Sequence, residues 1–184
     1  MPLPMRYSAV FVWENNCKGA FSLAKRICTL SLLCALCMAL SYLESLLPFA
    51  FIAPGVRLGL ANAAALLLLQ AGDVKGAFAV NIARILLSAL LFGTVMSLSF
   101  SLAGGIASLI VMSLLRNAKS ISPVGFSVAG GAVHNLFQLG VACCWIGQGV
   151  LFYLPILLLC GAVSGALIGF CAVLLSKRIS LRIF

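Results

Sequence analysis

The chain has 184 residues, of which 64% are hydrophobic and 8% charged, and its formal net charge is +9. A mean hydropathy of +1.22 excludes a water-soluble globular domain and predicts an integral membrane protein. A nucleic-acid-binding protein of this charge would gather its basic residues in a patch on a polar surface, whereas here they lie between apolar segments. We therefore expect a lipid bilayer, and no nucleic acid, around this chain.

Six apolar segments follow one another, separated by short loops that carry proline or glycine. Most approach the roughly 20 residues that a helix needs to cross the hydrocarbon core of a bilayer. The segments are residues 27–47, 57–71, 75–95, 97–115, 124–145 and 149–176. The second is short and has Gly59 near its start, so it is a candidate for a broken or re-entrant helix. The sequence predicts an all-α integral membrane protein, a bundle of about six transmembrane helices.

The distribution of Lys and Arg predicts the orientation, because these residues are retained on the cytoplasmic side. Cytoplasmic termini place all but two of the 12 Lys and Arg residues inside, leaving Arg57 outside and Arg84 within the third segment. We expect a multi-pass protein of the plasma membrane in three parts. These are a cytoplasmic N-terminal segment (1–26), a transmembrane domain (27–176) and a basic cytoplasmic tail (177–184).

Small residues four apart predict close helix packing in lipid, where tails are as apolar as leucine. Three segments carry such sets: Gly161, Gly165 and Gly169; Ala103 with Ala107 and Gly104 with Ser108; and Ala35 with Ala39. We expect packing faces at the first two sets. The pair in the first segment can face another helix of this chain, which is the default expectation, or a partner.

Polar side chains inside a membrane usually face the bundle interior, a cavity or one another. On the fifth segment His134, Asn135 and Gln138 fall within one helical turn and form one polar patch. Two interpretations stay open for this trio: a hydrogen-bond network that fixes helix order, or the lining of a solute site. Asn81, Arg84 and Ser88 line up in the same way on the third segment.

The two unusual arginines also have two interpretations each. Arg84 either extends to the cytoplasmic face or joins a polar interior. Arg57 either forms an exposed pair with Glu44 near the outer interface or closes over a pocket, where it would bind an anionic group.

Catalysis is not expected of this chain. It has three acidic residues, Glu14, Glu44 and Asp73, so the Asp-rich magnesium sites of prenyl transfer cannot be built. It lacks a GxxxxGK[ST] loop, so an ATP-driven process would need separate subunits. The single histidine, His134, lies within a span, far from Asp73 in a predicted loop. We expect no enzymatic activity, no metal site and no cofactor.

Six stretches of the chain resemble a known family. They are LSYLESLLPF (40–49), PGVRLGLAN (54–62), RILLSALLFG (84–93), SLAGGIASLIVM (101–112), GAVHNLFQL (131–139) and YLPILLLCGAVSGALIG (153–169). In order and spacing they are similar, over about residues 28–176, to heptaprenyl diphosphate synthase component I, also called the Gx transporter family. The family pattern more often has lysine at position 57 and glycine at 137. Arg57 keeps the charge, whereas we expect Phe137 to narrow the space beside the polar trio.

More remotely, the layout is similar to the six-helix substrate-binding S components of energy-coupling factor (ECF) transporters. In those proteins an AxxxA pattern on the first helix docks on the coupling subunit, and Ala35 with Ala39 matches it. The resemblance favours the substrate-binding membrane component of a small-molecule transporter, working with separate ATPase and coupling subunits. The residues expected to bind the solute are Arg57, Asn62, Arg84, His134, Asn135 and Gln138.

Two alternatives remain from the sequence. The first is a non-catalytic membrane subunit of heptaprenyl or polyprenyl diphosphate synthesis, beside a catalytic subunit. The second is a membrane component of a flavin-linked redox system.

Overall fold

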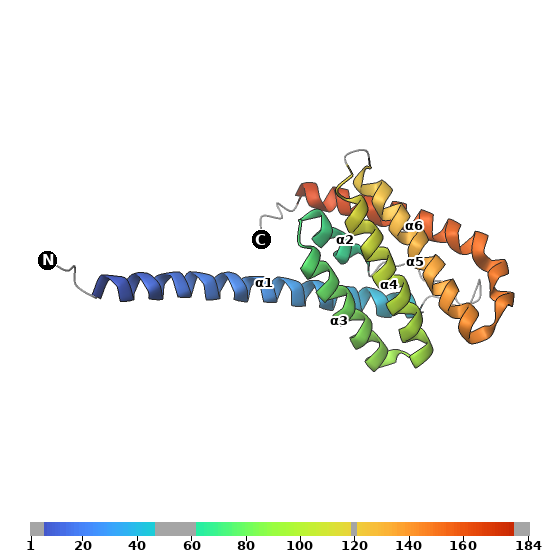
Figure 1. Ribbon diagram of the computed structural model, residues 1–184, viewed down its shortest axis with the longest axis horizontal. Coiled ribbons are helices and arrows are strands. Elements are labelled where there is room, and N and C mark those ends of the chain that lie inside the picture. Colours follow the sequence, from blue (N-terminus) through green and yellow to red (C-terminus); the bar gives the residue numbers. More distant parts are fainter. Residues whose placement is uncertain (1–5, 47–61, 119–120, 179–184) are drawn as a thin grey trace.

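The computed structural model describes residues 6–46, 62–118 and 121–178, and every regular element in these ranges is a helix (Figure 1). The elements are α1 (Arg6–Leu46), α2 (Ala63–Gln70), α3 (Val74–Phe92), α4 (Val95–Leu115), α5 (Pro123–Ile146), the short 3-10 helix η3 (Gln148–Tyr153) and α6 (Leu154–Arg178). The all-α membrane fold expected from the sequence is confirmed.

Four helices have the length and apolar composition of membrane spans. These spans are Leu23–Leu43 within α1, Val74–Leu91, Val95–Leu115 and Gln148–Leu175. Helix α5, with 24 residues, is about 36 Å long and can also cross the hydrocarbon core, although its polar side chains lower its hydropathy. Of the second predicted span, the structure describes only α2 with eight residues, and residues 57–61 lie outside the described ranges.

The helix boundaries follow from local sequence signals. Ser122 caps α5 by accepting a hydrogen bond from Gly125 N–H, and Pro123 takes the first helical position, where no N–H is needed. Thr94 caps α4 in the same way. Gly147 ends α5 with φ of +106°, and Gly72 makes the turn between α2 and α3 with φ of +93°, conformations that favour glycine.

The closest packing in the bundle joins α5 to α6, where two glycine faces meet. A Cβ atom on Gly131 would collide with the carbonyl oxygen of Gly161, and one on Gly165 would lie 2.6 Å from the carbonyl oxygen of Ser127. The hydroxyl of Ser127 donates to the carbonyl oxygen of Gly165 at 2.7 Å. The packing face predicted from Gly161, Gly165 and Gly169 is therefore confirmed.

Helix α4 uses two adjacent glycines to contact the helices on both its sides. A Cβ atom on Gly104 would lie 2.8 Å from the carbonyl oxygen of His134 in α5. One on Gly105 would lie 3.0 Å from Nδ2 of Asn81 in α3. Gly104 and Ser108 are both buried, which confirms that pair of the predicted packing set, whereas Ala103 and Ala107 are half-buried.

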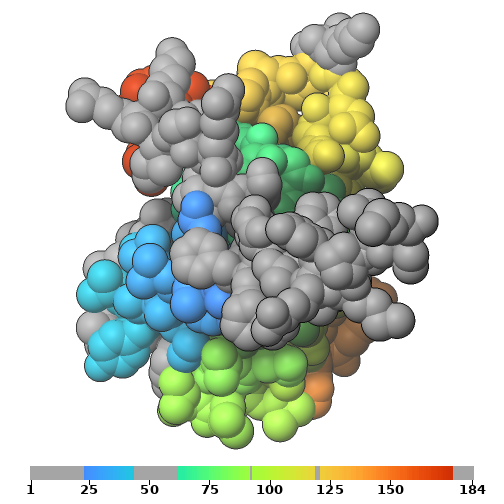
Figure 2. Space-filling model, turned by 90° about the vertical axis from the view of Figure 1, so that its left-hand side faces the viewer, coloured from blue at the N-terminus to red at the C-terminus, as the bar shows by residue number. Residues whose placement is uncertain are grey.

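Helix α1 stands at the edge of the bundle. Only 6% of its membrane-spanning window is buried, and its N-terminal half projects away from the other helices without a break at residue 26 (Figure 1). Residues 23–43 of α1 lie along one side of the molecule in Figure 2, and among them Cys37 and Ser41 are buried against the bundle. Ala35 and Ala39 are both exposed, so the default expectation that this pair packs inside the chain is wrong.

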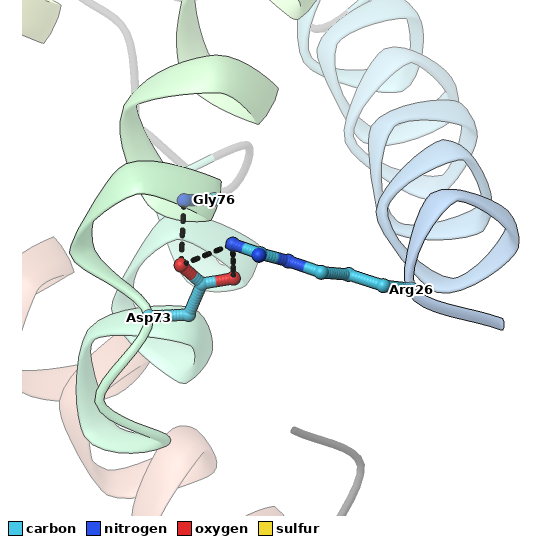
Figure 3. Close-up of polar contacts among 3 residues, drawn as sticks. All are labelled: Arg26, Asp73 and Gly76. Atoms are coloured by element: carbon cyan, nitrogen blue, oxygen red, sulfur yellow. Dashed lines mark hydrogen bonds and ion pairs between the residues drawn. The ribbon is translucent and has the colours of Figure 1, made fainter. Parts of the chain in front are cut away.

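One ion pair ties α1 to the turn before α3 (Figure 3). Arg26 Nη2 donates to both carboxylate oxygens of Asp73, at 3.0 and 2.9 Å. Asp73 is also the cap of α3, accepting from Gly76 N–H at 2.8 Å. The same residue thus begins one helix and anchors another.

Nearby, Arg116 Nη1 donates to the carbonyl oxygen of Leu69, at 3.0 Å. This carbonyl lies in the last turn of α2, where backbone acceptors lack helical partners. The bond ties the end of α4 to the end of α2. Arg26, Lys75 and Arg116 therefore gather at one end of the bundle, which we term the basic end.

The glycine contact between α5 and α6 predicts opposite outcomes for two substitutions in α5. Gly131→Ala should lower the free energy of unfolding by about 1–3 kcal/mol, because the new methyl group meets backbone that cannot move without separating the helices. Gly140→Ala, with no atom within 4 Å of the added Cβ, should raise stability by about 0.5–1 kcal/mol through helix propensity. Thermal unfolding in detergent measures both, and equal effects would contradict the packing described.

The two roles of Asp73 can be separated by substitution. Asp73→Asn keeps a capping oxygen but loses the charge, so we expect a loss of less than about 1 kcal/mol, as for a partly exposed ion pair. Asp73→Ala also removes the cap, and the loss should rise to about 1–2 kcal/mol. Arg26→Ala in the same unfolding assay serves as a control and should match Asp73→Asn. A loss for Asp73→Ala no larger than that for Asp73→Asn would show that the cap contributes nothing.

Candidate functional site

Five of the six residues expected to bind a solute belong to one polar region inside the bundle. Arg84, His134, Asn135 and Gln138 are buried, and Asn62 is half-buried at the start of α2. Arg57 lies outside the described residues. The region divides into a part around Arg84 and a part around His134, with Asn62 between them.

Arg84 lies in the interior, not at a membrane surface. Its side chain is 7% exposed, and its Nη2 donates to Asn81 Oδ1 at 2.6 Å and to Asn62 Oδ1 at 3.1 Å. The alternative that it extends to the cytoplasmic face is therefore wrong. The amide oxygens of Asn62 and Asn81 draw the guanidinium inward and connect α3 with the start of α2.

On α5, His134 and Gln138 contact each other as their spacing predicts. Gln138 Nε2 lies 3.0 Å from His134 Nε2, within hydrogen-bond distance. Both side chains lie against Gly104 of α4, since a Cβ atom there would come within 3.0 Å of His134 Nδ1 and 2.9 Å of Gln138 Cγ. The other amide atom, Gln138 Oε1, is buried and has no hydrogen-bond partner among the described residues.

Asn135 turns away from this pair toward α6. Its Nδ2 donates to the carbonyl oxygen of Leu157 at 2.8 Å, and its side chain is 1% exposed. A Cβ atom on Gly161 would lie 2.8 Å from the same Nδ2. The trio therefore serves two interfaces, with His134 and Gln138 at α4 and Asn135 at α6.

A small cavity with both polar and apolar lining residues lies where these elements meet. Its volume is about 20 Å³, room for about one water molecule. Its polar lining consists of Asn62, Ser127, His134, Asn135 and Ser164. The cavity thus brings together three of the predicted residues from α5 and the start of α2, while Arg84 is one hydrogen bond away through Asn62.

Ser127 and Ser164 line the cavity although neither was among the residues expected there, and one neighbour, Phe137, lies elsewhere than expected. Ser127 and His134 are seven residues apart, two turns on the same face of a helix, so helical spacing was the signal available. Phe137 was expected to narrow the space beside the trio, but its side chain is 49% exposed and does not line the cavity. It follows His134 by three residues, about 60° round the helix, so its exposure is decided by where the neighbouring helices pack and not by its spacing.

A second small cavity adjoins Arg84 on its other side. It also measures about 20 Å³, and its hydroxyl-bearing lining residues are Ser88, Ser97 and Ser101. Asn81 Nδ2 and Ser88 Oγ are buried without a hydrogen-bond partner among the described residues. Across residues 6–46, 62–118 and 121–178, no three His, Cys, Asp or Glu side chains lie together as metal ligands would.

Comparison with known proteins identifies the family. Residues 33–175 match the family described as heptaprenyl diphosphate synthase component I. The chain belongs to this family. No curated protein and no solved structure matches the chain.

The component I match covers the whole polar region. It includes every described site residue from Asn62 to Gln138, and the glycine faces of α4, α5 and α6. Residues 6–32, which form most of the projecting part of α1, lie outside it. The family resemblance read from the sequence is confirmed. The remote similarity to ECF S components is not shown by any solved structure.

Proposed function

We propose that this chain is a non-catalytic membrane component of heptaprenyl diphosphate synthesis that works beside a separate catalytic subunit. The observation that carries the proposal is the component I match over residues 33–175. Prenyl transfer from diphosphates uses magnesium held by carboxylates, and the chain has three acidic residues. One of them, Asp73, is engaged as a helix cap and an ion-pair partner. The chemistry is therefore assigned to the partner.

The polar interior supports a structural part in this function. A site for a small molecule measures about 300–1,000 Å³, whereas the cavity beside His134 measures about 20 Å³. Asn135 donates a hydrogen bond to the backbone of α6, and Arg84 donates to the amide oxygens of Asn62 and Asn81. The network then fixes the order of the helices, and the protein presents a rigid surface in the membrane.

The proposed placement is multi-pass in the plasma membrane, with both termini in the cytoplasm. Residues 1–26 and the tail 177–184 would lie outside the bilayer, and residues 27–176 would form the membrane domain. Support comes from the bias of Lys and Arg and from the basic end, where Arg26, Lys75 and Arg116 gather.

Co-expression tests the proposal. Affinity purification of the full chain should recover the polyprenyl diphosphate synthase catalytic subunit of the same organism, because the two would form one assembly. Membranes that contain both should form heptaprenyl diphosphate from farnesyl and isopentenyl diphosphates about tenfold faster than membranes with the catalytic subunit and an unrelated multi-pass protein. Recovery of ATPase subunits instead of the synthase would contradict the proposal.

A second candidate function is the binding of a solute for transport, with ECF-type ATPase and coupling subunits in trans. It is favoured by Gln138 Oε1 and Asn81 Nδ2, two buried polar atoms with no partner among the described residues, because a bound ligand could satisfy them. Asn62, Arg84, His134, Asn135 and Gln138 would bind the solute together with Arg57. The exposed Ala35 and Ala39 would dock on the coupling subunit.

Bound small molecules distinguish the two candidates. If the trio binds a solute, His134→Ala and Gln138→Ala should each weaken its binding about tenfold or more, since directional hydrogen bonds are lost. Mass spectrometry of the gently purified protein first identifies the molecule, and a binding assay then compares the variants. Leu136→Ala, on the exposed side of α5, is the matched control. Unchanged affinity in both test variants would remove the trio from any solute site.

A further inference from the structure

An open groove runs between α1 and α3 on the outer side of the bundle. Its volume is about 410 Å³, within the range of ligand sites and far larger than the cavity beside His134. Three of its lining residues are alanines, Ala35 of α1 and Ala79 and Ala83 of α3. Their small side chains leave open the space that larger ones would fill.

The lining of the groove extends along α1 and α3, which run in the same general sense and cross obliquely (Figure 1). Arg26 pairs with Asp73, and Leu30 lies beside Gly76, so the residue numbers of α1 and α3 rise together along the contact. On α1 the lining extends from Leu30 to Met38, about 12 Å of helix, and on α3 it covers the same length. A space of this form suits an extended hydrocarbon chain better than a compact ring.

The two ends of the groove differ in charge. Lys25 and Arg26 lie about one turn before its first residue on α1, and Lys75 lies one turn before its first residue on α3. These three cations are accompanied by one described carboxylate, Asp73, so this end carries a surplus of positive charge. At the other end the lining is apolar, with Met38 and Leu87. Complementarity calls for a ligand with an anionic head and an apolar tail.

We propose that this groove binds a polyprenyl diphosphate, with the first isoprene units between α1 and α3 and the diphosphate at Lys25, Arg26 and Lys75. The inference rests on the proposed function and names the ligand class of that function. A prenyl diphosphate has one hydrocarbon chain, which suits a single groove between two helices, whereas a phospholipid has two. Its diphosphate also carries more negative charge than the phosphodiester of a phospholipid, and so interacts more strongly with the three cations. The membrane component then holds the product that the catalytic subunit makes.

Photolabelling of the isolated full chain tests the site. The probe is a benzophenone analogue of farnesyl diphosphate, applied to the protein in phosphatidylcholine nanodiscs, with labelled peptides mapped by mass spectrometry. The label should fall on α1 and α3. Ala35→Phe, which fills the groove, should reduce labelling about tenfold or more, whereas Ala39→Phe, exposed on the same helix outside the lining, should leave it unchanged.

The head group is tested by charge and by competition. Lys75→Gln should weaken labelling by the diphosphate probe but not by the corresponding farnesol probe. Excess heptaprenyl diphosphate should remove the label, and excess phosphatidylglycerol should not. Equal competition by phosphatidylglycerol, equal loss in Ala35→Phe and Ala39→Phe, or labelling of other helices would each overturn the proposal. The photolabelling uses the isolated chain, so it does not depend on the catalytic subunit. If the chain fails to co-purify with that subunit but is still labelled, the proposed function is wrong and the binding site is not.

Discussion

The structure depends on a single constraint, that polar groups away from water must find partners within the protein. The interface of α5 and α6 meets it by bringing the two backbones very close, so that short side chains reach carbonyl oxygens on the next helix. Asn135 reaches Leu157, and Ser127 reaches Gly165, only because Gly131 and Gly161 let α5 and α6 touch. The glycine faces and the polar residues are therefore two halves of one interface.

Much of this arrangement was predictable from local sequence. The run of helices, the glycine face of α6 and the contact between His134 and Gln138 all follow from composition and from spacing along one helix. The position of Arg84 did not follow, because its partner Asn62 comes from another helix 22 residues away. The same limit applies to Phe137 and Ala35, whose orientation depends on which neighbours are present and not on their own segment.

The volumes of the cavity beside His134 and of the groove between α1 and α3 bear on where a ligand would bind. Sequence placed the emphasis on the polar trio as a solute site, since charged and amide side chains in a membrane usually mark one. The structure closes that region to about the size of a water molecule and leaves the larger space on the outside, between α1 and α3. The groove proposed to hold the ligand is therefore the larger of the two spaces and faces outward. In the proposed function, the polar interior fixes the order of the helices that form the groove.

The attachment of α1 differs in kind from the rest of the bundle. Helices α5 and α6 are held by backbone contact, which dissolved ions do not weaken, whereas the basic end of α1 is held by a pair whose arginine is 43% exposed. Exposed charge pairs are screened over about 10 Å at 0.1 M salt. Salt, and any anion that competes for Arg26, therefore weakens one modest contact of α1, whereas the apolar packing of Cys37 and the contact between α5 and α6 are unaffected.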